Sequence, residues 1–173
     1  MEAKSKVTVR DYQISKPSSV KGYDVHRMVA EICKESPYLF VDRGDHLIVR
    51  TSAALGGSGA EIPSPSENEI LGFDLRTSVA LRSGGKNIYP DSGDWRTRRQ
   101  WLEKQGGRKG FEVLAVHVTD RRIEIESKGK KYWIDCTEFK GVLAVRNRAE
   151  FLEALEKGIG RVGKAFGMGM LII

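Results

Sequence analysis

Hydrophobic and polar positions alternate along much of the first half of the chain, a pattern typical of β-strands. Residues 7–14 alternate in this way and are rich in β-branched side chains. From about residue 22 to 35, apolar side chains instead recur at positions i, i+3, i+4 and i+7, which predicts an amphipathic helix. Further strands are expected at 38–41, 46–50 and 70–81, with an irregular loop rich in Gly, Ser and Pro at 51–69.

The second half contains a similar order of elements. Asp94 is a favourable N-cap for a helix over residues 95–105, which Gly106 and Gly107 are expected to end. Asn147, followed three positions later by a glutamate, has the signature of a capping box for another helix. Strands are expected at 111–118, 122–126, 130–134, 139–145 and 168–173, the second and third forming a hairpin around 127–129.

Both halves thus follow the order β-α-β-β-α-β of the ferredoxin-like fold. In the first half the second helix is reduced, because the loop takes its place. The strand near residue 75 closes the first unit and also leads the second. We predict an α+β protein with tandem ferredoxin-like (RRM-like) folds, an N-terminal domain at 1–82 and a C-terminal domain at 83–173.

Charge is unevenly distributed along the chain, whose formal net charge is +6. Residues 1–78 hold 10 Lys and Arg against 11 Asp and Glu, whereas residues 79–173 hold 19 against 12. An excess of positive charge favours an anionic partner, nucleic acid first, and the second half should build most of that surface. Two ferredoxin-like units suit single-stranded or hairpin RNA, which proteins read with sheets, clefts and loops.

Other classes of function find little support. Cys33 and Cys136 lie far apart among apolar residues, as buried free thiols of a cytoplasmic protein do. The three histidines lack metal-ligand spacing, so we expect no metal and no cofactor. No apolar run approaches the ~18 residues of a membrane span, and the first residues lack the apolar core of a signal peptide. We therefore expect neither a membrane partner nor a small-molecule cofactor.

Tyr23 and His26 lie off the apolar stripe of the first helix, three residues apart and therefore on neighbouring positions. Imidazole can transfer protons near neutral pH. A His–Tyr pair without a metal is a minimal set for RNA transesterification, in which one group takes the 2′-OH proton and the other protonates the leaving 5′-oxygen. A capping tyrosine beside a solvated histidine is the alternative. Candidates for stabilising the charged phosphorane are Lys21, Arg27, Arg161 and Lys164.

Two clusters of basic side chains are candidate RNA contacts. The helix after Asp94 resembles an arginine-rich face for phosphates, and the hairpin carries five cations beside Tyr132 and Trp133. A solvated helix face and an edge that resists aggregation are the alternatives. The predicted contacts are Arg96, Arg98 and Arg99 on the helix, and Arg121, Arg122, Lys128, Lys130 and Lys131 on the hairpin.

The sixteen residues 158–173 contain five glycines within twelve positions. Glycine permits positive φ and close approach to a ligand, and exposed backbone N–H groups can bind an anion. The segment follows a helix and leads into a strand, the reverse of the order in a mononucleotide P-loop. A helix stop with a tight turn is the alternative to a loop that grips a polynucleotide. The predicted contacts are Gly158, Gly160, Arg161, Gly163, Lys164, Gly167 and Gly169.

Three stretches of the chain resemble the CasE family of CRISPR-associated endoribonucleases, which process precursor CRISPR RNA in type I-E systems and remain in the Cascade complex. Residues 22–28 resemble the Tyr-x-x-His motif near the start of the family's first helix. Residues 139–145 and 151–160 resemble the approach to its glycine loop. Residues 164–171 are similar to the closing Lys-Ala-x-Gly-x-Gly-Leu-Leu of that loop.

The resemblance implies metal-independent cleavage 3′ of a repeat hairpin, giving a 2′,3′-cyclic phosphate and a 5′-hydroxyl. It implies His26 as the acid/base with Tyr23 assisting, and as partners a CRISPR repeat RNA hairpin and the other subunits of a Cascade-type complex. The chain departs from the family in being short around residues 51–70 and slightly longer in the glycine loop. A non-catalytic RNA-binding subunit, or a protein whose partner is DNA, are the alternative functions.

Overall fold

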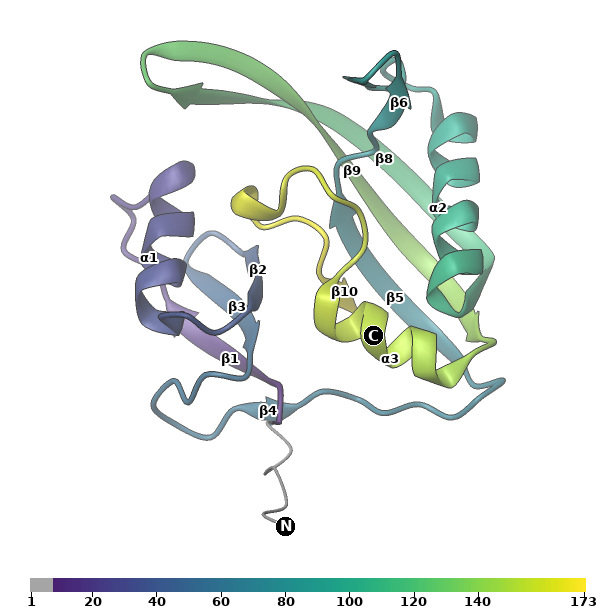
Figure 1. Cartoon of the computed structure of the whole chain (residues 1–173), viewed down its shortest axis with the longest axis horizontal. Coiled ribbons are helices and arrows are strands. Elements are labelled where there is room, and N and C mark those ends of the chain that lie inside the picture. The colour runs from purple at the N-terminus through teal and green to yellow at the C-terminus, as the bar shows by residue number, and fades with distance from the viewer. Residues whose placement is uncertain (1–7) are drawn as a thin grey trace.

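A computed structural model describes residues 8–173 of the chain, so residue 7, at which the first strand was expected to start, lies outside the described residues. Figure 1 shows two antiparallel sheets side by side, with the glycine-rich segment running between helix α1 and the second sheet. The predicted fold class is confirmed, since each sheet has the strand order of a ferredoxin-like unit.

The first sheet has the order β2-β3-β1-β4. Read from its other edge, this is the 4-1-3-2 order of the ferredoxin-like fold. Helix α1 packs its apolar stripe on the sheet through Val25 and Val29, which are buried. No helix lies between β3 and β4, as expected for the short segment after residue 51. The elements of this unit are β1 (Arg10–Ser15), α1 (Tyr23–Cys33), β2 (Tyr38–Asp42), β3 (His46–Thr51) and β4 (Ala60–Glu61).

The second sheet has the order β10-β5-β9-β8, again 4-1-3-2 within its own unit. Trp101 of α2 stacks on Phe139 of β9, with ring centroids 6.3 Å apart, and Phe151 of α3 is fully buried. A small hairpin, β6–β7, follows β5. The elements are β5 (Ile70–Thr77), β6 (Leu81–Ser83), β7 (Lys86–Ile88), α2 (Trp95–Lys109), β8 (Phe111–Ser127), β9 (Lys130–Val145), α3 (Arg148–Lys157), the 3-10 turn η1 (Lys164–Phe166) and β10 (Leu171–Ile172).

The boundary expected after residue 82 does not coincide with the division between the sheets. Strand β5 pairs with β9 and β10, so it belongs wholly to the second sheet. The strand at 70–81 was expected to close the first sheet. The two-residue strand β4 takes that position instead, because it pairs with β1. The sheets therefore divide between β4 and β5.

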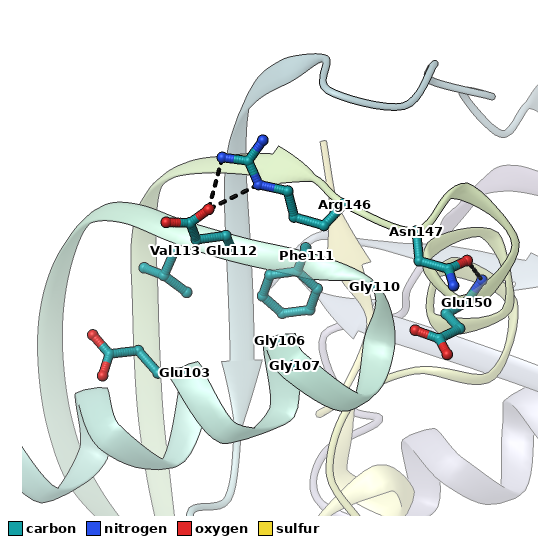
Figure 2. Close-up of a pocket in the computed structure, with 10 residues that line it drawn as sticks. All are labelled: Glu103, Gly106, Gly107, Gly110, Phe111, Glu112, Val113, Arg146, Asn147 and Glu150. Carbon is teal, nitrogen blue, oxygen red and sulfur yellow. Dashed lines mark hydrogen bonds and ion pairs between the residues drawn. The ribbon is translucent and has the colours of Figure 1, made fainter.

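The expected helix stop at Gly106 and Gly107 is wrong. Helix α2 continues to Lys109 and ends at Gly110, whose φ of 76° is left-handed. A Cβ at Gly106 would lie 2.6 Å from the carbonyl oxygen of Phe111, so this glycine serves close packing of the helix on the sheet. Figure 2 shows the three glycines and Phe111 at this helix–strand junction.

Strands β8 and β9 form one long ribbon that joins the segments expected as separate strands. Its turn lies at Lys128 and Gly129, whose φ values of 52° and 71° are both positive, as a type I′ turn requires. Asn147 caps α3 as predicted, since its side-chain oxygen accepts from the Glu150 N–H at 3.2 Å. The Asn147 N–H donates to the Gly110 carbonyl, which ties α3 to the end of α2.

Buried Arg50 connects the two units. Its Nε and Nη2 pair with the Asp11 carboxylate of β1 at 2.7 and 2.8 Å. Its Nη1 donates to the carbonyl of Leu155 at 2.9 Å and to that of Leu171 at 2.8 Å. These two carbonyls lie in α3 and β10, on either side of the glycine-rich segment, so one side chain attaches both ends of that segment to the first sheet.

Candidate active site and nucleic-acid interface

The glycine loop, defined as residues 158–169, has a fixed shape. All five of its glycines have positive φ. Gly158 has φ 79°, and a Cβ there would lie 2.6 Å from the Gly169 carbonyl oxygen. That oxygen accepts from the Ile159 N–H at 2.8 Å, and the Gly169 N–H donates to the backbone carbonyl of Arg76 in β5 at 2.7 Å. The positive φ angles and close backbone contacts of the loop therefore account for the glycines. The contact of these glycines with RNA stays a prediction.

The loop brings an aromatic side chain to the first helix. Phe166 of η1 lies with its ring centroid 6.2 Å from that of Tyr23, and the rings of Tyr23 and His26 are 5.1 Å apart. Tyr23 is 48% exposed, while His26 is partly buried. The predicted pair thus lies together at the first turn of α1, where the loop contacts that helix.

Tyr38 is a member of this group that sequence reasoning missed. Its hydroxyl lies 3.0 Å from Nδ1 of His26, with the donor set by the tautomer of the ring. Burial raises the pKa of the Tyr38 phenol, so the hydroxyl keeps its proton across the neutral range. The hydrogen bond orients the ring and leaves Nε2 of His26 without a hydrogen bond to any described residue. A tyrosine at the start of a strand gives no signal of this role in the sequence.

Lys164, a candidate for phosphorane stabilisation, is hydrogen-bonded to the end of α3. Its Nζ donates to the carbonyl of Lys157 at 2.8 Å, which satisfies the C-terminal end of α3. Burial lowers the pKa of Lys164, and repulsion from Lys109 of α2 lowers it further. No hydrogen bond joins Lys164 to His26 within residues 8–173. Arg161 is exposed on the same side of the loop as Lys164.

The cations at the start of α1 are accessible. Lys21 and Arg27 are exposed, and Arg27 forms an ion pair of 3.7 Å with Asp24 one turn away. Exposed pairs of this kind contribute little to stability, so Arg27 can exchange its partner at low cost. Both side chains border the first turn of the helix that holds His26.

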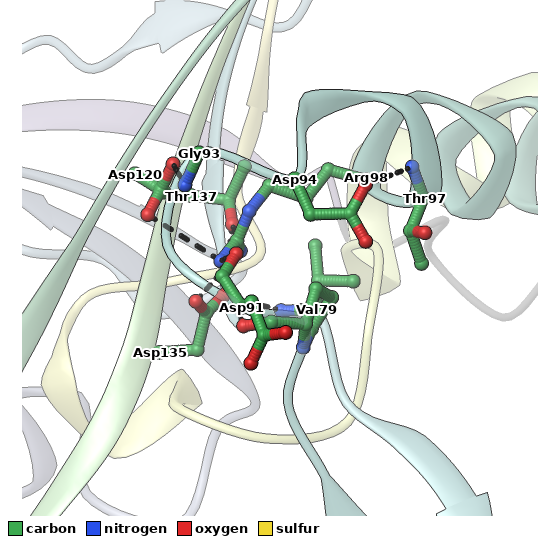
Figure 3. A network of polar contacts seen from close by, with 10 residues as sticks. Val79, Asp91, Gly93, Asp94, Thr97, Arg98, Asp120, Asp135 and Thr137 are labelled. Atoms are coloured by element: carbon green, nitrogen blue, oxygen red, sulfur yellow. Dashed lines mark hydrogen bonds and ion pairs between the residues drawn. The ribbon is translucent and has the colours of Figure 1, made fainter.

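The expectation that Arg98 lies on an exposed face of α2 is wrong. Arg98 is 1% exposed, and it pairs with Asp135 at 2.6 Å and with Asp120 at 3.5 Å. It also donates to Thr137 and to the carbonyl of Pro90, as part of the network in Figure 3. The carboxylates that bury this arginine come from β8 and β9, far along the chain, so helical spacing did not reveal them.

The other predicted contacts of α2 and the hairpin reach the surface. Arg96 is exposed, and Arg99 pairs with Glu103 one turn further along the helix at 2.9 Å. Tyr132 and Trp133 are exposed at 42% and 56%, so the hairpin presents aromatic rings as well as charge. The exposed cations of the hairpin are Arg121, Arg122, Lys128, Lys130 and Lys131.

Within residues 8–173, no group of three or more His, Cys, Asp or Glu side chains could hold a metal ion. No helix among these residues is long and apolar enough to cross a membrane.

The fold matches solved structures along nearly the whole chain. Cse3 of Thermus thermophilus, bound to an RNA representing a pre-cleavage complex, is 20% identical with a TM-score of 0.80, and 95% of this chain covers 98% of that one. Cas6e from Escherichia coli K-12 is 19% identical with a TM-score of 0.70, covering 95% and 97%. A chain of a CRISPR RNA-guided surveillance complex is 16% identical with a TM-score of 0.70, covering 95% and 98%.

Sequence comparison identifies the family. No curated protein matches the chain. The family model described as CRISPR associated protein matches residues 85–173, slightly more than half of the chain. This match includes α2, the long ribbon, α3 and the glycine loop. The chain therefore belongs to this family of CRISPR-associated proteins.

Proposed function

We propose that the chain is a metal-independent endoribonuclease that binds the repeat hairpin of precursor CRISPR RNA and cleaves it at the base of the stem. The observation that carries the proposal is the group of Tyr23, His26 and Tyr38, because it presents an oriented imidazole with one nitrogen that makes no hydrogen bond to residues 8–173. The match to Cse3 bound to a pre-cleavage RNA, along nearly the whole chain, supports the same reading.

In the proposed reaction the 2′-oxygen attacks the adjacent phosphorus while the bond from phosphorus to the 5′-oxygen breaks. One group takes the proton of the 2′-OH, and another donates a proton to the departing 5′-oxygen. The products are a 2′,3′-cyclic phosphate and a 5′-hydroxyl. His26 acts as acid or base through Nε2, and Tyr23, exposed beside it, assists. Each such group contributes on the order of 10²–10⁴-fold to the rate.

The proposed partners are the repeat hairpin and the subunits of a Cascade-type complex that keeps the product. Structural neighbours of this chain include a subunit of a CRISPR RNA-guided surveillance complex. The exposed hairpin of β8 and β9, with its cations and two aromatic rings, is the proposed contact with the base of the RNA stem.

The test is a cleavage gel with a labelled repeat RNA. His26→Ala should abolish cleavage while binding of the hairpin survives. Unchanged cleavage by this variant would refute the mechanism. EDTA should leave the rate unaltered, and loss of activity with the chelator would indicate a metal nuclease.

A non-catalytic RNA-binding subunit is the second candidate, and the orientation of Lys164 favours it. This lysine bonds to the end of α3 and not to the group around His26. The same gel separates the two functions, because both proteins bind the repeat RNA and the endoribonuclease alone cuts it. Equal affinity for a DNA hairpin of the same sequence would instead support a DNA partner.

A further inference from the structure

A cleft of about 820 Å³ lies between the C-terminal half of α2, the glycine loop and the segment around β6. Figure 1 shows the glycine loop between α1 and α2, and none of the residues that line the cleft belongs to α1, the helix that holds His26. Gly158 and Gly160 form part of its wall, together with the side chain of Trp101. The cleft is thus a separate feature from the group around His26.

Its charge is entirely positive. Seven of the residues that line the cleft are Lys or Arg, and none is Asp or Glu. They come from three separate segments of the chain, which folding brings together. The seven are Arg82, Lys104, Arg108, Lys109, Lys157, Arg161 and Lys164.

Most of these cations form no ion pair with any described residue. Lys157 pairs with Glu153 at 2.6 Å, and Lys164 donates to a backbone carbonyl. The other five make no hydrogen bond or ion pair with any described residue. Burial lowers the pKa of Lys164, and repulsion from the charge of Lys109 lowers it further. Gathering like charges in a concave site destabilises the fold unless an anion binds there.

The ends of helices do not explain this cluster. Arg108 and Lys109 lie in the last turn of α2, and Lys157 in the last turn of α3, where the helix dipole favours cations. Lys104 lies further from the end of α2. Arg82 and Arg161 belong to no helix at all. Lys164 donates to the carbonyl of Lys157 at the end of α3. Three of the seven charges, on Arg82, Lys104 and Arg161, therefore need another reason.

The shape of the cleft limits the anion that it can take. Its volume lies in the range of small-ligand sites, about 300–1,000 Å³, which suits a single strand better than a double helix. Single strands bind in positively charged grooves that follow their phosphates. We propose that the cleft binds the phosphodiester backbone of an unpaired RNA strand, as a second RNA site separate from the group around His26. The inference rests on the proposed function in taking RNA as the partner.

The test uses a fluorescein-labelled twelve-nucleotide oligouridine and fluorescence anisotropy over a range of salt concentrations. The double variant Lys104→Gln/Arg108→Gln removes two unpaired charges of the cleft and keeps good helix formers at both positions. We expect the affinity to fall about tenfold or more. The dependence of log K on log salt should become shallower by about 1.4, since each single-strand phosphate contact contributes about 0.7.

The matched control is Lys34→Gln/Lys140→Gln, which removes the same net charge outside the cleft. Lys34 follows α1, and Lys140 points to the face of β9 opposite Phe139 and α2. This control should bind oligouridine as the wild type does. Equal losses of affinity in both double variants would mean that net charge alone causes the effect, and this would overturn the proposal. Wild-type affinity in Lys104→Gln/Arg108→Gln would also overturn it.

Two further arms define the ligand. A blunt RNA duplex of twelve base pairs should lose no more affinity in the cleft variant than in the control variant. Uridine monophosphate at the same phosphate concentration should not displace oligouridine. A larger loss with the duplex, or displacement by the mononucleotide, would overturn the assignment to an unpaired strand. His26→Ala should bind oligouridine normally, so failure of the cleavage proposal would leave this result standing.

Discussion

The two ferredoxin-like units differ in how far each is complete. The second has both helices and a core of fifteen buried residues, among them Leu143 and Phe151. The first has one helix, two residues in its fourth strand, and a core of six buried residues. A unit with so small a core buries little apolar surface of its own, and surface burial is what stabilises a small domain.

The first unit therefore depends on the second. Leu39 and Val41 of β2 pack with Met170, and Phe40 of the same strand lies against Gly167 of the glycine loop. Arg50 joins its sheet to α3 and β10. The group around His26 is thus held by contacts between the units, so substitutions there should affect both stability and cleavage. Substitutions of residues buried within the second unit, such as Arg98, should affect stability alone.

The largest loss of stability should follow Arg98→Met, inside the second unit. Removing this buried partner leaves the Asp135 carboxylate without its counter-charge, which costs about 3–5 kcal/mol. Urea denaturation should show the loss. Arg99 is the next residue of the helix, and it forms an exposed ion pair with Glu103. Arg99→Met should therefore lower the free energy of unfolding by no more than about 1 kcal/mol. Equal effects of the two variants would contradict the network in Figure 3.

Arg50→Met should cost less stability, about 2–4 kcal/mol, and more activity. Two buried carbonyls lose a donor, while the partly exposed Asp11 can still reach water. Because both ends of the glycine loop lose their attachment to the first sheet, cleavage of bound repeat RNA should slow in single-turnover assays. Affinity for oligouridine should stay near that of the wild type. An unchanged cleavage rate would show that the hydrogen bonds of Arg50 do not support the group around His26.

Gly158→Ala should destabilise by about 1–3 kcal/mol, because a left-handed residue gains a Cβ that meets the Gly169 carbonyl oxygen at 2.6 Å. Gly107→Ala is the matched control. It lies inside α2 with nothing within 4 Å of its Cβ position, so it should stabilise by about 0.5–1 kcal/mol. Thermal unfolding of the two variants should therefore shift in opposite directions.

Tyr38→Phe should have the smallest effect on stability, about 0.5–1.5 kcal/mol for one hydrogen bond. In the wild type, burial raises the pKa of Tyr38 above the ordinary 10.0, so folding favours the protonated phenol. That contribution is complete below pH 10 and is lost as pH rises through the folded-state pKa. The stability difference from the wild type should stay constant up to pH 10 and shrink above it. Cleavage should fall about tenfold as His26 loses its orientation, and unaltered cleavage would exclude that role.

Periodicity and capping were enough to predict the fold class, the reduced second helix and the cap at Asn147. They could not reveal contacts between residues far apart in the chain. Arg98 resembled its exposed neighbours, since its carboxylate partners lie 22 and 37 residues away on other elements. Tyr38 and Gly106 were missed or misread for the same reason, because their roles depend on which side chain or carbonyl the folded chain brings next to them.

The hydrogen bonds of Arg50 to α3 and β10 also have a consequence for the synthesis of the chain. The two carbonyl partners of Arg50 lie 105 and 121 residues further along. Helix α1, with His26, leaves the ribosome long before the segment that supports it, and contacts so distant in sequence form slowly. Under the proposed function, a nascent chain therefore carries Tyr23 and His26 without a finished site, and it should not cut RNA until the second unit has been made and has docked.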